Sequence, residues 1–254
     1  MISVLSPSKD LDLKRPVIAD STQTPEFIKK SQDIIQVMKK KKVRDLMKLM
    51  NISEKLAEEN FRRYQQMQPE FNASNARPAL FTFNGDVYRG LDAASLNIPQ
   101  LDYVENHCRI LSGLYGILRP FDLIQPYRLE MGTSVSVSRK KNLYAFWSDQ
   151  VTSVLNTSLN QQEHPCLINL ASQEYFEVID IKNIKFPVVH IHFRERRNGK
   201  ISFLSYNAKR ARGLMARYMA IHQVKALDQI RDFDLENYRY DAKLSSATEF
   251  YFVR

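Results

Sequence analysis

Hydrophobic and polar positions along the chain change repeatedly between the two-residue period of strands and the 3.6-residue period of helices. Short apolar runs predict strands at residues 2–5, 79–83, 133–137, 167–170, 188–193, 201–206 and 250–253. Longer periodic segments predict helices at residues 24–41, 43–49, 53–64, 101–111, 146–159 and 208–222. With no internal repeat or linker, we expect residues 1–254 to form one compact α/β domain, with a mixed sheet and surrounding helices.

Local signals predict where several of these elements begin and end. Thr24 followed by Pro25 is typical of a helix start, and Ser53 has the character of an N-cap. Asn84-Gly85 predicts a turn that closes strand 79–83. Asn198-Gly199 predicts a hairpin that joins strands 188–193 and 201–206.

Positive charge is concentrated in two segments of the 254-residue chain, whose net charge is +9. Residues 29–63 carry a net charge of +6 and residues 194–217 carry +7, which leaves the remainder slightly negative. Cations gathered in this way are typical of a surface that binds a polyanion. For the run of four lysines at 39–42 alone, a solvated helix end is the preferred interpretation. For residues 194–217 the bias is stronger and favours a polyanion-binding surface.

Several classes of protein are disfavoured by what the sequence lacks. It contains no Gly-x-Gly-x-x-Gly turn, no P-loop and no nucleophile elbow. Cys108 and Cys166 give no disulfide framework, and no apolar run is long enough for a membrane span. The first residues do not match a signal peptide. We therefore expect a cytoplasmic protein with reduced thiols, no cofactor and no membrane partner.

Two histidines offer the best pattern for metal ligands. His190 and His192 are two residues apart on a predicted strand, so their side chains share one face. A metal site needs three or four ligands, and none follows nearby; His164 with Cys166 is equally incomplete. We expect no metal site, and direct iron binding by these four residues is the least favoured alternative.

The two short helices within residues 43–64 meet at the tight turn Met50-Asn51-Ile52. Such a pair can present backbone N–H groups to a phosphate, as helix-hairpin-helix modules do on duplex DNA. Four cations surround this turn: Lys48, Lys55, Arg62 and Arg63. Because such hairpins usually contain glycine and this one has none, an ordinary helical hairpin is equally supported.

The predicted helix at 208–222 carries a second group of cations. Arg210 and Arg217 share one face, and Lys209 and Arg212 flank it. The planar guanidinium group binds two phosphate oxygens at once. Gly213 in the middle of this helix costs roughly 1 kcal/mol relative to alanine, which indicates that another helix or a ligand approaches closely there.

Polar residues follow several predicted strands, where α/β folds bind ligands. Ser6 and Lys9 follow strand 2–5, and Asn169 and Ser172 lie at the end of strand 167–170. The turn-rich segment 111–131 adds Tyr115, Arg128 and Glu130. Arg128 and Glu130 could pair with each other or address a ligand.

Taken in order, these motifs resemble the YaaA family of peroxide-stress proteins. The matching strings are Leu5–Lys9, Gly85–Tyr88, Leu111–Met131, Ile168–Ser172 and Ala208–Met215. The resemblance implies a compact α/β domain of unusual fold with a helix-hairpin-helix-like element and a basic cleft. It also implies a cytosolic role in hydrogen-peroxide stress, binding of double-stranded and branched DNA, and restriction of free intracellular iron.

Two hypotheses of function follow. In the favoured one, the protein binds DNA without sequence specificity, and its phosphates are contacted by Lys9, Lys48, Lys55, Arg62, Arg63, Lys209, Arg210, Arg212 and Arg217. In the alternative, an enzyme acts on a nucleotide or another anionic small molecule. Its cleft would contain Ser6, Lys9, Tyr115, Arg128, Glu130, Asn169, Ser172 and Lys209, with Glu130 or Tyr115 as the acid or base. A deep pocket would favour the enzyme, and an open basic groove would favour DNA binding.

Overall fold

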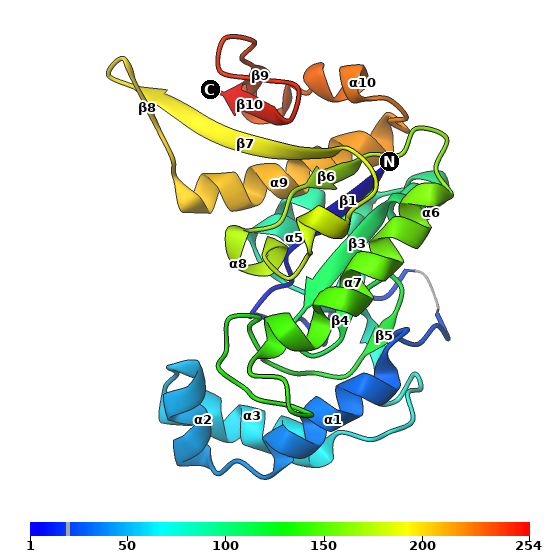
Figure 1. The fold of residues 1–254 in the computed structure, drawn as a ribbon, viewed down its shortest axis with the longest axis vertical. Coiled ribbons are helices and arrows are strands. Elements are labelled where there is room, and N and C mark those ends of the chain that lie inside the picture. Colours follow the sequence, from blue (N-terminus) through cyan, green and yellow to red (C-terminus); the bar gives the residue numbers. More distant parts are fainter. Residues whose placement is uncertain (19–20) are drawn as a thin grey trace.

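The computed structural model describes residues 1–18 and 21–254, and its core is a mixed eight-stranded sheet (Figure 1). The strand order is β4-β3-β1-β6-β7-β10-β9, with β8 paired to β7. These strands are β1 (Ile2–Leu5), β3 (Cys108–Ser112), β4 (Gly116–Leu118), β6 (Leu167–Asn169), β7 (Val188–Arg197), β8 (Lys200–Ser202), β9 (Arg239–Tyr240) and β10 (Glu249–Val253). The short strands β2 (Arg77–Pro78) and β5 (Leu123–Ile124) form a separate antiparallel pair.

Five strands of the large sheet run parallel. β1 pairs with β3 on one side and with β6 on the other, and β7 then pairs with β6 and β10. Ser3, in the middle of β1, is opposite Cys108 and Ile168. The chain therefore continues to one side of β1 first and returns later to its other side, so the strand order reverses at β1. Open α/β sheets bind ligands at such reversal points, beyond the carboxyl ends of the strands.

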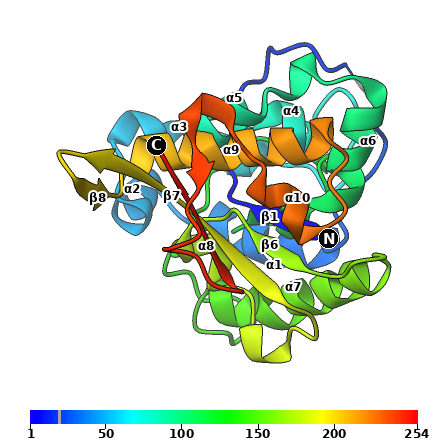
Figure 2. The ribbon, with the colours of Figure 1, turned by 90° about the horizontal axis from the view of Figure 1, so that it is seen from above.

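Helices cover both faces of the sheet. In Figure 1 and Figure 2, α5, α6 and α9 lie on one face, α7 lies on the other, and α1–α3 form a layer at one end of the molecule. The α-helices are α1 (Ile28–Lys39), α2 (Val43–Met50), α3 (Glu54–Gln66), α4 (Ala79–Thr82), α5 (Asp86–Leu91), α6 (Ile98–His107), α7 (Leu143–Asn160), α8 (Gln173–Phe176), α9 (Ser205–Ile221) and α10 (Leu227–Arg231). Short 3₁₀ turns occupy Ala93–Ser95, Ile181–Asn183 and Leu235–Asn237. The predicted α/β class, with a mixed sheet and surrounding helices, is confirmed.

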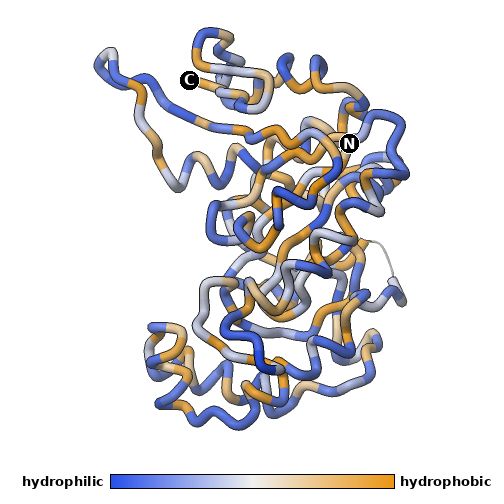
Figure 3. The backbone as a smooth tube through the Cα atoms, in the orientation of Figure 1, coloured by the Kyte–Doolittle hydropathy of each residue, from blue (hydrophilic) through white to orange (hydrophobic). Residues whose placement is uncertain are grey.

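The hydrophobic core follows the sheet. Figure 3 shows hydrophobic positions concentrated in the central strands and the helix faces against them, whereas the β7–β8 hairpin is largely hydrophilic. Ile2, Val4 and Leu5 of β1 are fully buried, as are Phe250 and Phe252 of β10. The predicted hairpin at Asn198-Gly199 is present, and both of its residues have a positive φ, at 49° and 74°. Its second strand ends at Ser202 and not at residue 206 as predicted, because α9 begins at Ser205.

The backbones of α5 and α9 approach each other very closely where they cross. Gly213 of α9 faces the carbonyl oxygen of Val87 in α5, and Gly90 of α5 faces the carbonyl oxygen of Arg210 in α9. A Cβ atom at either glycine would overlap the opposing carbonyl oxygen. Of the two expectations for Gly213, close approach of another helix is therefore confirmed.

The predicted pair of short helices is also present. Asn51 adopts a left-handed conformation with φ of 49° at the end of α2, which asparagine tolerates better than most residues. Ser53 caps α3, because its Oγ accepts a hydrogen bond from the Leu56 amide at 3.4 Å. The Tyr64 hydroxyl of α3 donates to the carbonyl oxygen of Arg128 at 2.8 Å. The turn thus forms without glycine, and the pair is tied to the loop that follows β5.

The structure differs from the sequence predictions over four segments: residues 79–83, 84–85, 101–111 and 133–137. Residues 79–82 form α4, not a strand, because an apolar run buried on all sides has the same composition in either conformation. Asn84-Gly85 consequently joins α4 to α5 and does not close a strand as predicted. The predicted helix 101–111 ends at His107, and β3 follows with no breaking residue between them. Residues 133–137 alternate in burial but pair with no strand in the described ranges, apart from a bridge at Val137.

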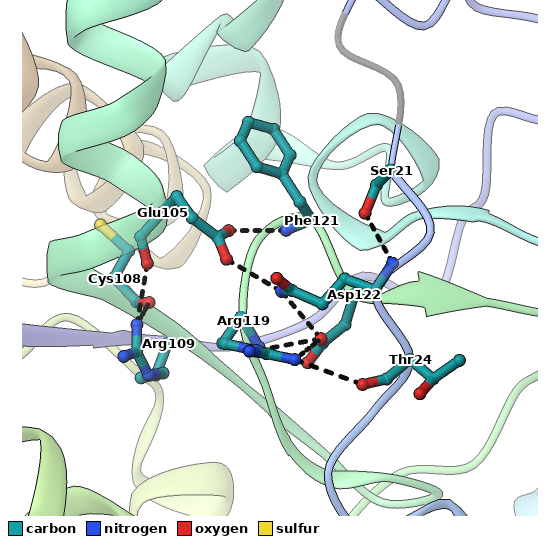
Figure 4. Close-up of polar contacts among 9 residues, drawn as sticks. Ser21, Thr24, Glu105, Cys108, Arg109, Arg119, Phe121 and Asp122 are labelled. Atoms are coloured by element: carbon teal, nitrogen blue, oxygen red, sulfur yellow. Dashed lines mark hydrogen bonds and ion pairs between the residues drawn. The ribbon is translucent and has the colours of Figure 1, made fainter.

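The start of α1 also differs from the prediction. The helix begins at Ile28 and not at Thr24, whose carbonyl oxygen accepts a hydrogen bond from Arg119 at 3.3 Å. Figure 4 shows the polar network around this segment. Gln23 donates to Glu105 at 2.9 Å and to Asp122 at 3.0 Å, and Arg119 pairs with Asp122 at 2.9 Å. Burial raises the pKa of Asp122, and the hydrogen bonds from Arg119 oppose that rise. This network fixes the chain against α6 just before α1 begins.

Replacement of Gly213 tests the close crossing of α5 and α9. Alanine would stabilise an isolated helix by about 1 kcal/mol through its higher propensity. Overlap with the Val87 carbonyl oxygen predicts the opposite sign, so we expect Gly213→Ala to lower the free energy of unfolding by about 1–3 kcal/mol. Urea denaturation followed by circular dichroism measures the difference. A variant as stable as the wild type would show that the helices are not in such close contact.

Candidate functional site

A pocket of about 350 Å³ lies beyond the carboxyl ends of β1 and β6, where the strand order reverses. Its walls come from the loop after β1, the first turn of α5, the region of α8 and one face of α9. Residues that line these walls include Ser6, Lys9, Asp86, Ser172, Glu174 and Arg212. The sheet topology thus places a pocket where open α/β proteins bind ligands.

Two serines hold the rear of this pocket together. The backbone amide of Ser172 donates to Ser6 Oγ at 2.8 Å, and Ser6 Oγ donates to Ser172 Oγ at 3.2 Å. The Tyr88 hydroxyl of α5 donates to the Ser6 carbonyl oxygen at 3.0 Å. These bonds join the loops after β1 and β6 to α5, so the shape of the pocket is set before any ligand enters.

One wall of the pocket is cationic. Lys209 is exposed, and Arg212 lies half-buried one turn further along α9. Burial lowers the pKa of Arg212, and the neighbouring Arg194 lowers it further. Among residues 1–18 and 21–254, no carboxylate forms an ion pair with Arg212. A buried cation without an acidic partner is costly, and a bound anion would offset that cost.

Carboxylates also line the pocket, so its charge is mixed. Asp86 pairs with Arg89 at 2.5 Å, and Glu174 Oε1 accepts a hydrogen bond from the Gly132 amide at 3.1 Å. Asp10 contributes a third carboxylate near the loop after β1. A pocket that held only phosphate would gain nothing from these acidic groups, which would repel it.

A small hollow adjoins the pocket and shares Lys9 with it. There Lys9 Nζ pairs with Glu130 Oε1 at 2.5 Å, and Arg128 Nη2 approaches the same oxygen at 3.3 Å. Arg128 Nε is buried and has no hydrogen-bond partner within the described residues. Arg128 and Glu130 therefore pair with each other, and Lys9 joins them.

The structure separates the predicted cleft residues into three groups. Ser6, Lys9, Ser172 and Lys209 line the pocket, and Arg128 and Glu130 line the adjoining hollow. Tyr115 and Asn169 line neither.

Tyr115 lies elsewhere, because its side chain is fully buried in the core and its hydroxyl accepts a hydrogen bond from the Gln125 amide at 3.3 Å. Burial raises the pKa of Tyr115 well above its usual value, so it is placed poorly for the acid or base role suggested by the sequence. Asn169 supports the turn after β6: its Oδ1 accepts from the Ala171 amide at 2.9 Å, and its side-chain nitrogen lies 3.0 Å from His190 Nδ1.

Sequence reasoning did not assign Asp86, Arg89, Glu174 or Tyr175 to the pocket. All four residues lie in polar segments, residues 84–90 and 169–175, that follow apolar runs in the sequence, and this position is the signal that points to them. The prediction that Asn84-Gly85 closes a strand conceals the position of Asp86 at the start of a helix.

The predicted DNA-contacting cations also differ in their surroundings. Lys48, Lys55 and Arg62 are exposed on α2 and α3, whereas Arg63 pairs with Glu59 at 2.5 Å. Arg210 pairs with Glu236 at 2.6 Å. The Arg217 guanidinium donates to the Leu91 carbonyl oxygen at 3.1 Å and to Ser95 Oγ at 2.7 Å. Arg210 and Arg217 thus hold α9 against neighbouring segments.

Cation-bearing elements lie together on one side of the molecule. Figure 1 and Figure 2 both place the α2–α3 pair and the β7–β8 hairpin on the same side, and in Figure 1 α8 and the first turns of α9 lie between them. The hairpin carries three exposed cations: Lys200, together with Arg196 and Arg197, which pair with Asp241 at 3.7 Å and with Glu195 at 3.1 Å. Segments far apart in the sequence therefore lie along the same side of the molecule, and each carries exposed cations.

The histidine pair has partners within the protein. His190 contacts Asn169, and His192 Nε2 contacts the carboxylate of Glu249 on β10. His164 is exposed, and Cys166 is buried at the amino end of β6. Within the described parts of the chain, no three His, Cys, Asp or Glu side chains gather into a group that could hold a metal ion.

Fold and site together define an α/β protein with a mixed-charge pocket at the carboxyl edge of its sheet and cation-bearing elements on one side. The chain belongs to the YaaA family of peroxide stress proteins, whose profile matches residues 1–244. A UPF0246 protein of Janthinobacterium sp. (strain Marseille) is 44% identical over 100% of this chain and 98% of its own length. UPF0246 proteins of Bordetella avium and Flavobacterium johnsoniae are 45% and 43% identical, over 100% and 99% of this chain and 99% of each relative.

The helices over residues 1–18 and 21–254 include none with both the length and the apolar character that a membrane crossing demands.

Paired serine variants test the arrangement at the rear of the pocket. Ser6→Ala leaves the Ser172 amide without its acceptor, whereas Ser172→Ala removes only the bond between the two hydroxyls. An unsatisfied donor costs more than a lost hydroxyl pair, so we expect Ser6→Ala to lower the free energy of unfolding by about 1–3 kcal/mol and Ser172→Ala by less. Urea denaturation measures both. Equal losses, or a larger loss in Ser172→Ala, would contradict the role given to Ser6.

Proposed function

We propose that this protein binds double-stranded or branched DNA without sequence specificity as part of its role in peroxide stress. One observation carries the proposal: elements of the two basic segments, distant in the sequence, lie along the same side of the molecule, and each bears exposed cations. A duplex is a regular array of phosphates, so a surface that engages it needs cations at separated points with a common orientation. The α2–α3 pair and the α9 region with the β7–β8 hairpin supply two such points.

The α2–α3 pair has the features of a phosphate-binding element. The helix α3 has 13 residues, and its amino end follows directly on the turn at Asn51. Amide groups at a helix amino end and the positive end of its dipole favour an anion. Lys48 and Lys55 are exposed to either side of this turn. Contacts of this kind position a duplex without reading its bases, which explains the expected lack of sequence specificity.

The cations with protein partners have a different part in this proposal. Arg210 and Arg217 are engaged by Glu236 and by the segment after α5, so they brace α9, while the exposed Lys209 contacts the DNA backbone. Arg63 similarly pairs with Glu59, which leaves Arg62 as the freer arginine of α3. Lys9 is held by Glu130 and contributes less to phosphate binding than its charge suggests.

The proposed role is cytoplasmic, in the compartment where a bacterial chromosome is exposed to peroxide. Restriction of free intracellular iron is part of the same proposal, and its support is the family to which the chain belongs. DNA binding would place the protein where reduced iron and peroxide do the most damage.

Salt dependence with matched lysine variants tests DNA binding. We expect the affinity for duplex DNA to fall steeply with salt, and Lys48→Gln/Lys55→Gln to flatten the slope of log affinity against log salt by up to about 1.8, at about 0.9 per phosphate contact. Fluorescence anisotropy across a salt series measures both effects.

The control removes two exposed lysines near the amino ends of the parallel strands, Lys185→Gln/Lys225→Gln. It lowers the net charge by the same amount and should leave the slope almost unchanged. The proposed surface would be contradicted if the wild type bound DNA weakly with an affinity independent of salt. It would also be contradicted if the control flattened the salt slope as much as Lys48→Gln/Lys55→Gln does.

A further inference from the structure

The pocket at the carboxyl edge of the sheet has a chemistry that duplex binding does not explain. Contacts to a DNA backbone need exposed cations, whereas this pocket contains serine hydroxyls, carboxylates and a half-buried arginine. Its volume of about 350 Å³ lies near the lower end of the range of small-molecule sites, roughly 300–1,000 Å³. A duplex cannot enter such a space, but one of its building blocks can.

The cationic wall specifies an anion of limited size. Arg212 lies half-buried with no carboxylate partner in the described residues, and Lys209 lies one turn before it on the same helix. The position of this wall is fixed, since Gly213 follows Arg212 directly and is locked against Val87 of α5. A rigid guanidinium fork beside a flexible ammonium group is well suited to one phosphate group.

The remaining walls specify what the anion is attached to. Asp86 and Glu174 present carboxylate oxygens, which accept hydrogen bonds from the amino and imino groups of a nucleobase. Ser6 and Ser172 add hydroxyl groups, and Pro7 adds apolar surface beside the buried rings of Tyr88 and Tyr175. These walls suit a ligand that combines a phosphate with N–H donors and a small apolar body.

We propose that this pocket binds one nucleotide unit, with its phosphate at Lys209 and Arg212 and its base toward the carboxylates. Two kinds of molecule offer such a nucleotide unit: a free nucleoside monophosphate, and a DNA duplex from which one nucleotide is displaced. The second source rests on the DNA binding proposed above. Proteins that reach a single base take it out of the stack, and an unpaired base costs least to displace.

The first experiment uses free ligands and does not depend on DNA binding. Isothermal titration compares deoxyadenosine and deoxycytidine monophosphates with the corresponding nucleosides and with inorganic phosphate. The nucleotides should bind more tightly than either part alone. Arg212→Gln should weaken nucleotide binding by at least about tenfold, the loss expected for one charge-assisted hydrogen bond. Arg212→Lys should recover part of it.

The matched control is Lys185→Gln, which removes one exposed cation near the amino ends of the parallel strands, outside the pocket lining. It should leave nucleotide affinity within about twofold of the wild type, because one unit of surface charge acts weakly at that distance. Glu174→Gln should change the relative affinity for the two bases, because it replaces one of the carboxylate acceptors of the pocket with an amide.

The second experiment identifies the source of the nucleotide. Anisotropy compares a fully paired duplex with the same duplex carrying one bulged nucleotide. A tighter complex with the bulged duplex, whose advantage Arg212→Gln removes, assigns the pocket to a displaced nucleotide of DNA. Nucleotide binding without that advantage assigns it to a free nucleotide. Both results support the site.

Three results would overturn it: no binding of either nucleotide and no bulge preference, phosphate binding as tightly as nucleotides, or an Arg212→Gln variant that binds nucleotides like the wild type. Failure of the fully paired duplex to bind would remove the proposed DNA-binding function alone, because the free-ligand titration stands independently of it.

Discussion

The close crossing of α5 and α9 is the constraint on which the site depends. Two glycines, Gly90 and Gly213, let the backbone of each helix reach the carbonyl oxygens of the other. Larger residues at these positions would force the two helices apart, to the usual distance of about 8–10 Å between helix axes. α9 carries Lys209 and Arg212, and α5 carries Asp86, Tyr88 and Arg89. The crossing therefore brings the cationic and acidic walls of the pocket into one small space.

The sheet supplies the other half of the site. Because β1 has β3 on one side and β6 on the other, the loops after β1 and β6 meet at the point where the strand order reverses. Ser6 and Ser172 join those loops by hydrogen bonds, and Tyr88 joins them to α5. α5 thus supports both halves of the site, because it packs against α9 and is hydrogen-bonded to the loop after β1. The pocket is consequently a product of sheet topology and helix packing together, and the polar loops alone would not define it.

The sequence predicts strands well where apolar runs are isolated, as at residues 2–5, 167–170 and 250–253. It fails at β3, because α6 passes into the strand at His107 and Cys108 with no glycine or proline between them. It also fails at α4, a helix buried on every side, whose apolar run carries no period. Ser6, Ser172 and Lys209 could be assigned to a cleft because they follow strands or occupy a basic helix. Tyr115 could not be recognised as a core residue, nor Arg210 as the partner of Glu236, because those contacts join distant segments.

Lysine acetylation footprinting by mass spectrometry tests the central claim, that DNA lies across the side shared by α2–α3 and α9. The extent of acetylation of each exposed lysine in the folded protein is compared with and without saturating duplex. Protection of Lys48, Lys55 and Lys209, with Lys185 and Lys225 unchanged, is the result predicted by their positions. Protection confined to Lys185 and Lys225, or equal labelling of all five, would contradict the account.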